Sequence, residues 1–198
     1  ISANKPEWNI VDMALAQAGI IHVPIYPTIS TDEYDYILQH SEVRAIIVGN
    51  KAIYSKVKPV AGKIKTLKDI FSFDPVEGVR PYAEIAEKGR ENADRYRDEL
   101  KKIRDSIDPE EMVTIIYTSG TTGNSKGVML SHRNLVTNAI TTSKAHHLGY
   151  GHRAVSFLPL CHVYERMVNY HFQYKGMTVY YVGNLGQIMS AIKEIKPH

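Results

Sequence analysis

The chain has 198 residues, of which 43% are hydrophobic, 23% charged and 9% aromatic. A chain of this length can bury a sizeable core, and its 13 glycines and 9 prolines exclude collagen-like and low-complexity classes. The net charge is only +3, from 24 basic and 21 acidic side chains, which is too small to indicate a polyanionic partner. We therefore expect no nucleic-acid partner.

Cys161 is the only cysteine, so no disulfide can form within the chain, and a reducing compartment, the cytoplasm, fits best. The longest apolar runs have the length of strands, and no secretory signal pattern opens the chain. Because the chain begins at Ile1 and stops at His198 directly after a helical pattern, we expect it to be a piece of a longer protein.

Helical and strand patterns alternate along the first part of the chain. Apolar residues recur at helical spacing up to Gly19, a residue type that often ends helices, and Ser30 with Glu33 forms a capping-box pattern. The predicted elements are a helix over 8–18, a short strand over 20–27 that its prolines terminate, a helix over 31–40 and a buried strand over 43–48. This alternation predicts an α/β fold with mostly parallel sheets flanked by helices.

A densely charged stretch follows over 82–107. Its acidic and basic residues pair at i,i+4 spacing, as Glu84 does with Lys88, and only a thin apolar stripe accompanies them. The pattern predicts one solvated helix on the domain surface rather than a helix for a partner or a membrane. Beyond it, the predicted elements are strands over 113–117 and 128–130, a helix from Ser131 to about His147, strands over 155–158 and 177–182, and a helix over 185–195.

A loop rich in hydroxyl groups and glycine lies between the strands predicted over 113–117 and 128–130. Its glycines allow close backbone approach, its hydroxyls offer hydrogen bonds and its one lysine offers a cation, which together suit a polyphosphate. An ordinary Ser/Thr/Gly surface loop is the alternative interpretation. The candidate phosphate-binding residues are Thr118, Ser119, Gly120, Thr121, Thr122, Gly123 and Lys126.

Other nucleotide, metal and hydrolase motifs fit less well. A Walker A loop needs Gly before the lysine and Ser or Thr after it, but those places hold Ser125 and Gly127. The histidines of 146–152 lack the glutamate or cysteine partners of a metal site, and Ser119 lacks the preceding glycine of a nucleophile elbow. A kinase-like site, a metal centre and a serine hydrolase are therefore disfavoured.

The segment Tyr117–His132 resembles the signature loop of the adenylate-forming enzymes, which include acyl-CoA synthetases, luciferases and peptide-synthetase adenylation domains. The family often has Pro where this chain has Ser125. The segment Leu158–Arg166 is similar to the family's next motif, in the form found in long-chain fatty acyl-CoA synthetases, and the stretches Asn4–Trp8 and Val23–Thr28 also resemble that subfamily.

The resemblance covers nearly the whole chain. It implies that 1–198 is an incomplete N-terminal adenylation (AMP-binding) domain without its C-terminal domain. Residues 1–108 would precede the phosphate loop, and residues 109–198 would contain the loop and the acyl pocket.

The resemblance implies a two-step reaction in the parent enzyme. A long-chain fatty acid attacks the α-phosphate of Mg·ATP to give an acyl-adenylate and pyrophosphate, and coenzyme A then displaces AMP to leave a thioester. In this scheme the loop and Lys126 hold the β- and γ-phosphates, and Thr118 lies near Mg²⁺, a cation that favours oxygen ligands. His162 and Val163 would line the acyl and adenylate pocket.

Three features of the family have no match in this chain. They are an aromatic-Gly-x-Thr-Glu segment whose Glu helps to bind Mg²⁺, an Asp that holds the ribose, and a catalytic lysine on a small C-terminal domain. We therefore expect no catalytic residue within these 198 residues and no activity from the chain alone. Glu165 and Arg166 are either pocket residues or an ion pair along one helix.

Alternative functions stay open. The chain could be a stand-alone nucleotide-binding module or an interaction remnant without a ligand, and the parent could deliver its acyl group to a carrier protein instead of coenzyme A. Peripheral contact of the parent with the inner face of a membrane is compatible with a lipid substrate. Nothing in the sequence indicates an oligomeric state.

Overall fold

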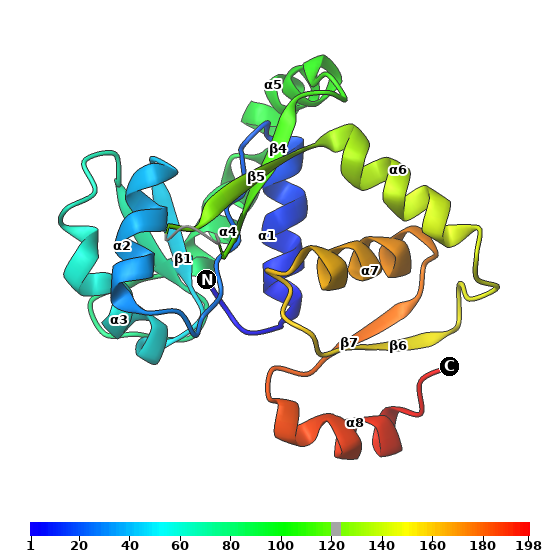
Figure 1. Cartoon of the computed structure of the whole chain (residues 1–198). Coiled ribbons are helices and arrows are strands. Elements are labelled where there is room, and N and C mark those ends of the chain that lie inside the picture. The colour runs from blue at the N-terminus through cyan, green and yellow to red at the C-terminus, as the bar shows by residue number, and fades with distance from the viewer. Residues whose placement is uncertain (120–123) are drawn as a thin grey trace.

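The computed structural model describes residues 1–119 and 124–198, which form three small sheets with helices packed around them (Figure 1). Helix α1 (Pro6–Gln17) lies centrally, between the first sheet and the last one. Within the described residues, the first and last sheets are parallel, and one hairpin is antiparallel. The predicted α/β fold with mostly parallel sheets is confirmed.

The first sheet contains β1 (Ala45–Val48), β2 (Asp69–Ser72) and β3 (Arg80–Pro81), paired in that order. Helices α2 (Thr31–His40) and α3 (Lys51–Ala61) pack against it.

The middle of the chain begins with two helices, α4 (Tyr82–Glu91) and α5 (Ala93–Ser106). They are followed by an antiparallel hairpin of β4 (Met112–Thr118) and β5 (Lys126–Ser131), and then by α6 (His132–Ser143).

The last part of the chain is a strand–helix–strand unit. Strand β6 (Arg153–Ser156) and strand β7 (Thr178–Tyr181) pair in parallel, and α7 (Val163–Tyr174) makes the crossover that a parallel pair requires. A short 3₁₀ turn (Leu185–Gln187) leads into α8 (Ile188–Ile195).

Local signals in the sequence predict several boundaries correctly. Gly19 follows α1 with φ of 65°, a conformation that favours glycine. The Ser30–Glu33 capping box forms, because the Glu33 amide donates to the Ser30 hydroxyl (3.2 Å) and the Ser30 amide donates to the Glu33 carboxylate (3.0 Å). Ser131 caps α6 in the same manner, although that helix ends at Ser143 rather than near His147.

Two predicted elements are wrong. The segment over 20–27 is not a strand, because only His22 forms a β-bridge, to Thr114, and the prolines at 24 and 27 cannot donate to a ladder. The charged stretch over 82–107 is two helices rather than one. Asn92 interrupts it by donating its side-chain amide to the Lys88 carbonyl (2.8 Å), a local bond that competes with helix propagation.

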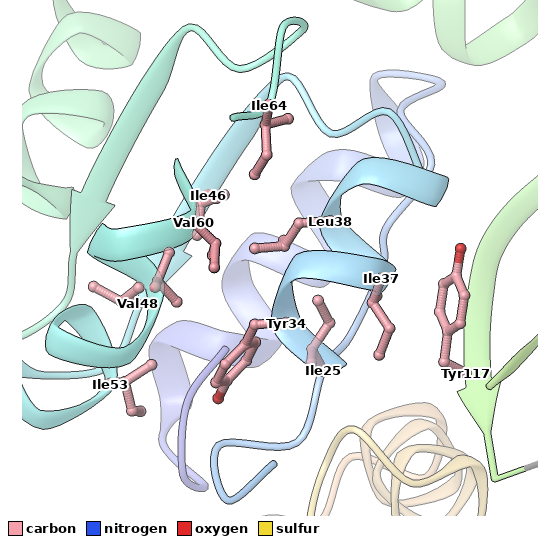
Figure 2. Close-up of a cluster of buried hydrophobic side chains, with 11 residues drawn as sticks. Ile25, Tyr34, Ile37, Leu38, Ile46, Val48, Ile53, Val60, Ile64 and Tyr117 are labelled. Carbon is pink, nitrogen blue, oxygen red and sulfur yellow. The ribbon is translucent and has the colours of Figure 1, made fainter. Parts of the chain in front are cut away.

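The main hydrophobic core lies between α2, α3 and the first sheet (Figure 2). Tyr34 and Leu38 from α2 are fully covered, and the Tyr34 hydroxyl donates to the Tyr26 carbonyl (2.9 Å), so its one polar group is satisfied. Tyr117 joins this core from β4, on the opposite side from the strands (Figure 2). The hairpin is therefore attached to the N-terminal core through Tyr117, together with the partly buried Ile115. The buried members of this core are Ile25, Tyr34, Ile37, Leu38, Ile46, Val48, Ile53, Val57, Val60, Ile64 and Tyr117.

Candidate functional site

The candidate phosphate loop joins the two strands of the hairpin. Thr118 at the end of β4 lies directly opposite Lys126 at the start of β5, so the hydroxyl and the ammonium group mark the two sides of the loop's base. Both side chains are exposed, as is Ser119. The other candidate residues, at 120–123, lie outside the described residues.

Tyr117 fixes the strand directly before the loop. Its ring is buried, its hydroxyl lies 2.6 Å from Nδ1 of His40, and the His40 ring meets it edge-on with centroids 5.8 Å apart. His40 in turn stacks on Tyr36 (5.4 Å). Burial raises the pKa of the Tyr117 hydroxyl, so this group stays neutral.

Gly127 packs tightly across the hairpin from Tyr117. A Cβ atom at this position would lie 2.7 Å from Cγ2 of Ile115 and about 3.5 Å from the Tyr117 ring. A contact of 2.7 Å is too close, so the Ile115 side chain would have to move. Packing within the hairpin therefore favours glycine after the lysine.

His162 and Val163 lie at the start of α7. His162 is the N-cap residue, and its Nδ1 accepts a hydrogen bond from the Tyr164 amide (3.2 Å). Both His162 and Val163 are exposed, which leaves their outer faces available to a substrate. The neighbouring Cys161 is buried, and burial raises the pKa of its thiol to about 12, so it cannot act as a thiolate.

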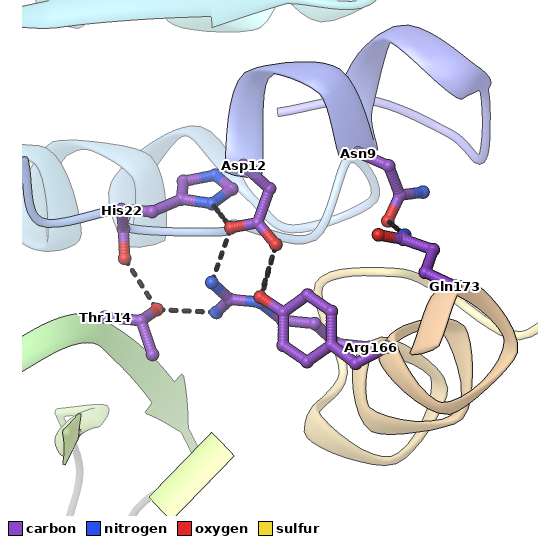
Figure 3. Close-up of polar contacts among 7 residues, drawn as sticks. Asn9, Asp12, His22, Thr114, Arg166 and Gln173 are labelled. Atoms are coloured by element: carbon purple, nitrogen blue, oxygen red, sulfur yellow. Dashed lines mark hydrogen bonds and ion pairs between the residues drawn. The ribbon is translucent and has the colours of Figure 1, made fainter. Parts of the chain in front are cut away.

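A buried polar network lies between α1, β4 and α7, and the sequence analysis missed it (Figure 3). Arg166 is fully buried, and its guanidinium donates to both carboxylate oxygens of Asp12 (2.5 and 3.2 Å) and to the Thr114 hydroxyl (2.7 Å). The Thr114 hydroxyl donates to the His22 carbonyl (2.7 Å), and the Tyr170 hydroxyl donates to Asp12 (2.5 Å). These five residues are called the Arg166 network below.

The charges of the Arg166 network are matched. Burial alone would raise the pKa of Asp12, but the hydrogen bond from His22 and the charge of Arg166 outweigh it and hold the pKa at about 2. Burial lowers the pKa of His22, so its ring is neutral near pH 7. Because Asp12 is then a carboxylate, the Nδ1 of His22, 2.7 Å away, carries the proton and donates it to the hydrogen bond.

Glu165 belongs to a separate buried cluster. It accepts hydrogen bonds from the Ser156 hydroxyl (2.6 Å) and the Asn169 amide (3.2 Å), and burial raises the pKa of its carboxyl. Arg166 pairs with Asp12 and not with Glu165, so the alternative of an ion pair along one helix is wrong. Neighbours along a helix point in different directions, and here each finds its own buried partners.

Other sites find little support in the described residues. Among 1–119 and 124–198, no three His, Cys, Asp or Glu side chains gather as a metal site would require. A surface groove of about 700 Å³ lies between α4 and α5, away from the hairpin loop. No helix among the residues that the structure describes is long and apolar enough to cross a membrane.

Comparison with known proteins identifies the family to which this chain belongs. The whole chain, 1–198, matches the family model described as AMP-binding enzyme. It is 33% identical to acyl-CoA ligase 891, peroxisomal, of Penicillium roqueforti, over 99% of this chain and 30% of that protein. It is also 33% identical to long chain acyl-CoA synthetase 1 of Arabidopsis thaliana, over 98% of this chain and 31% of that protein.

A solved structure shares the fold. The long-chain-fatty-acid-CoA ligase of Archaeoglobus fulgidus superposes with a TM-score of 0.75 at 26% identity, over 98% of this chain and 37% of that one. The fold is thus that of part of the N-terminal domain of adenylate-forming enzymes. The chain belongs to the AMP-binding enzyme family. It spans about 30% of the length of the curated relatives it matches.

Replacing Gly127 by Ala tests the packing role of this glycine. The added methyl group must push Ile115 away, so we expect the free energy of unfolding to fall by about 1–3 kcal/mol. Urea unfolding followed by fluorescence of Trp8, the only tryptophan, measures the change. Gly62→Ala is the control, because no atom lies within 4 Å of a Cβ there, and it should leave stability unchanged or raise it by about 0.4–1 kcal/mol. Equal losses in both variants would contradict the packing argument.

Asp12 gives the chain a pH-dependent stability. Its pKa falls from 3.8 to about 2 on folding, so its contribution is present above pH 4 and is lost as the pH falls through about 2. We expect this loss to be about 2 kcal/mol and to be visible in urea midpoints of the wild-type chain between pH 5 and 2.

The variant Asp12→Asn checks the source of that loss. It should be destabilised by about 3–5 kcal/mol at pH 7, because Arg166 is left buried without its counter-charge, and the deficit should shrink below pH 4. Asp74→Asn is the control, since that carboxylate pairs with Lys5 on the surface and should cost less than about 1 kcal/mol. A constant deficit at every pH would show that the Asp12 charge is not the cause.

Proposed function

We propose that the whole protein activates a long-chain fatty acid with ATP and passes the acyl group to coenzyme A. The observation that carries this proposal is the hairpin, which presents the Thr118 hydroxyl and the Lys126 ammonium on opposite sides of a loop rich in glycine and hydroxyl groups. Its support from the comparisons is that relatives named as acyl-CoA ligase and long chain acyl-CoA synthetase match over nearly the whole chain.

The loop's role is to hold the departing pyrophosphate. As the fatty-acid carboxylate attacks the α-phosphate, negative charge develops on the β- and γ-phosphates, and a nearby cation with several donors stabilises it. Lys126 supplies the cation, and Thr118 and Ser119 supply hydroxyls together with the residues at 120–123. Tyr117 and Gly127 keep the two strands in place, so these groups need little reorganisation.

The residues present supply only part of a Mg²⁺ coordination shell. The Thr118 hydroxyl is an exposed oxygen donor at the edge of the loop, which is the ligand type that Mg²⁺ prefers. The remaining ligands would be phosphate oxygens, water and groups outside 1–198. When bound, the cation would offset phosphate charge.

His162 and Val163 form the proposed acyl and adenylate side of the site. The N-cap position fixes the His162 backbone, and its ring is exposed where it can contact a carboxylate. The buried thiol of Cys161, whose pKa burial raises to about 12, is unsuited as an acyl acceptor, which agrees with an external thiol such as that of coenzyme A.

The 198 residues alone are proposed not to catalyse the reaction, because the family's catalytic lysine, ribose-binding Asp and Mg²⁺-binding Glu have no counterpart in them. Delivery to a carrier protein in place of coenzyme A is the second candidate within the same chemistry. Location in the cytoplasm, with peripheral contact of the parent with a membrane, stays a prediction. Several relatives are named as peroxisomal, acyl-CoA ligase 891 among them, which makes that compartment a further candidate.

Fatty-acid-dependent ATP–pyrophosphate exchange on the whole protein, with the 198-residue chain run beside it, tests the proposal. Exchange by the whole protein with a long-chain acid, and none by the chain, is the expected result. Coenzyme A and a phosphopantetheinylated carrier protein, offered in turn, then identify the acceptor. No exchange by the whole protein with any carboxylate would overturn the enzymatic proposal.

Lys126→Ala tests the role of the loop. In the whole protein the variant should lower the exchange rate by about 100-fold, because the developing phosphate charge loses its cation. Lys102→Ala is the matched control, since Lys102 is exposed on α5 near the far end of β4, and it should keep the wild-type rate. Equal rates for the two variants would remove Lys126 from the site.

A further inference from the structure

The two halves of the proposed site lie on different elements, α7 and β4. His162 begins α7, and Arg166 follows one helical turn later, with its amide donating to the His162 carbonyl (3.1 Å). Thr118 ends β4, and Thr114 lies four residues earlier on the same strand. The site is therefore correctly formed only if α7 and β4 hold one relative position.

One buried hydrogen bond joins the two elements directly. Arg166 Nη1 donates to the Thr114 hydroxyl, and that hydroxyl donates onward to the His22 carbonyl (Figure 3). Thr114 thus uses its hydroxyl as acceptor and donor at once. Its backbone is also fixed. On one side the Ile115 amide donates to the His22 carbonyl (3.1 Å) and the His22 amide donates to the Val113 carbonyl (3.0 Å), and β5 lies on the other side.

The remaining donors of Arg166 restrict its orientation. Nε and Nη2 both contact the Asp12 carboxylate, which gives a fork-like pairing with directional preference. Asp12 neutralises the charge of the guanidinium, and Thr114 accepts a hydrogen bond from Nη1, a donor that does not contact Asp12. What that bond adds is a defined position of α7 against the strand that leads to the phosphate loop.

We propose that Arg166 is a positioning residue for the reaction proposed above: by joining α7 to β4 it holds His162 in register with Thr118. The inference rests on that proposed function. Arg166 is fully buried, so it acts through the two elements it connects. A displacement of about 1 Å between reacting groups can reduce a rate by about 100-fold, so such a link has a measurable effect on catalysis.

Thr114→Val in the whole protein tests the link. Valine keeps the shape and strand preference of threonine, removes the hydroxyl and leaves the Asp12–Arg166 pair intact. We expect kcat for adenylate formation to fall about 10-fold while KM for ATP changes less than about twofold. Thr114→Ser, which restores the hydroxyl, should recover most of the loss in kcat.

A control and a double-mutant cycle separate positioning from general stability. Tyr181→Phe removes a different buried hydrogen bond, from Asn9 on α1, and should lower the melting temperature without lowering kcat. In a His162→Ala background, Thr114→Val should add less than about a twofold effect, because the group it positions is gone. A full and independent effect in that background, or an unchanged kcat in Thr114→Val, would overturn the proposal.

Amide hydrogen exchange gives a readout that does not depend on activity. Thr114→Val should speed exchange at the first turn of α7 (163–166) and at the end of β4 (115–118), and Tyr181→Phe should not. If the wild-type protein lacked exchange of pyrophosphate but these amides responded as expected, the proposed function would fail and the link would stand. Equal responses in both variants would overturn the link itself.

Discussion

A guanidinium with no exposed surface constrains everything around it. Arg166 keeps its charge at any pH at which proteins fold, and an unmatched charge in the interior would cost several kcal/mol. Asp12 on α1 supplies the counter-charge, and Thr114 on β4 accepts a further hydrogen bond. Three segments that are distant in the sequence must therefore meet at one point before the central part of the fold is stable. The neutral ring of His22 and the hydroxyl of Tyr170 complete the set of partners.

Strand β4 is held on both faces by different halves of the molecule. Thr114 and Tyr117 are three residues apart, so they point to opposite faces of the strand. Thr114 faces α7 and α1, whereas Tyr117 inserts beside α2 in the N-terminal core. The strand that leads into the loop is consequently held against both α7 and the N-terminal core, as the proposed site requires.

Much of the fold follows from local rules. Capping at Ser30 and Ser131, the left-handed Gly19 and the apolar runs at β1 and β4 each predict their elements correctly. The prediction fails where a polar residue decides the packing. On α1 the apolar pattern includes Ile10, which is exposed, whereas Asp12 is buried because it pairs with Arg166. Arg166 lies 154 positions further along the chain, so no local pattern predicts this pairing.

In the candidate site, too, local motifs predicted some residues correctly, whereas buried packing contacts were not predicted. A long ordered motif was enough to select Thr118 and Lys126, and the structure places these two opposite each other. Nothing in the order of residues indicated that Gly127 serves packing, or that Arg166 points inward. The one available signal was Asp12, a charged residue among the apolar residues of α1, and this signal is weak because charged residues usually lie on the surface.

The distance between Asp12 and Arg166 along the chain has a consequence for biosynthesis. A ribosome adding 5–20 residues per second needs roughly 8–30 seconds to make the 154 residues that separate them. During that time the first sheet and its core, which draw mainly on residues 25–81, can already form, but Asp12 on α1 has only His22 and not yet its counter-charge Arg166 as a partner. The emerging chain thus carries a folded N-terminal sheet and a detached α1, and this interval is when a chaperone would have most to protect.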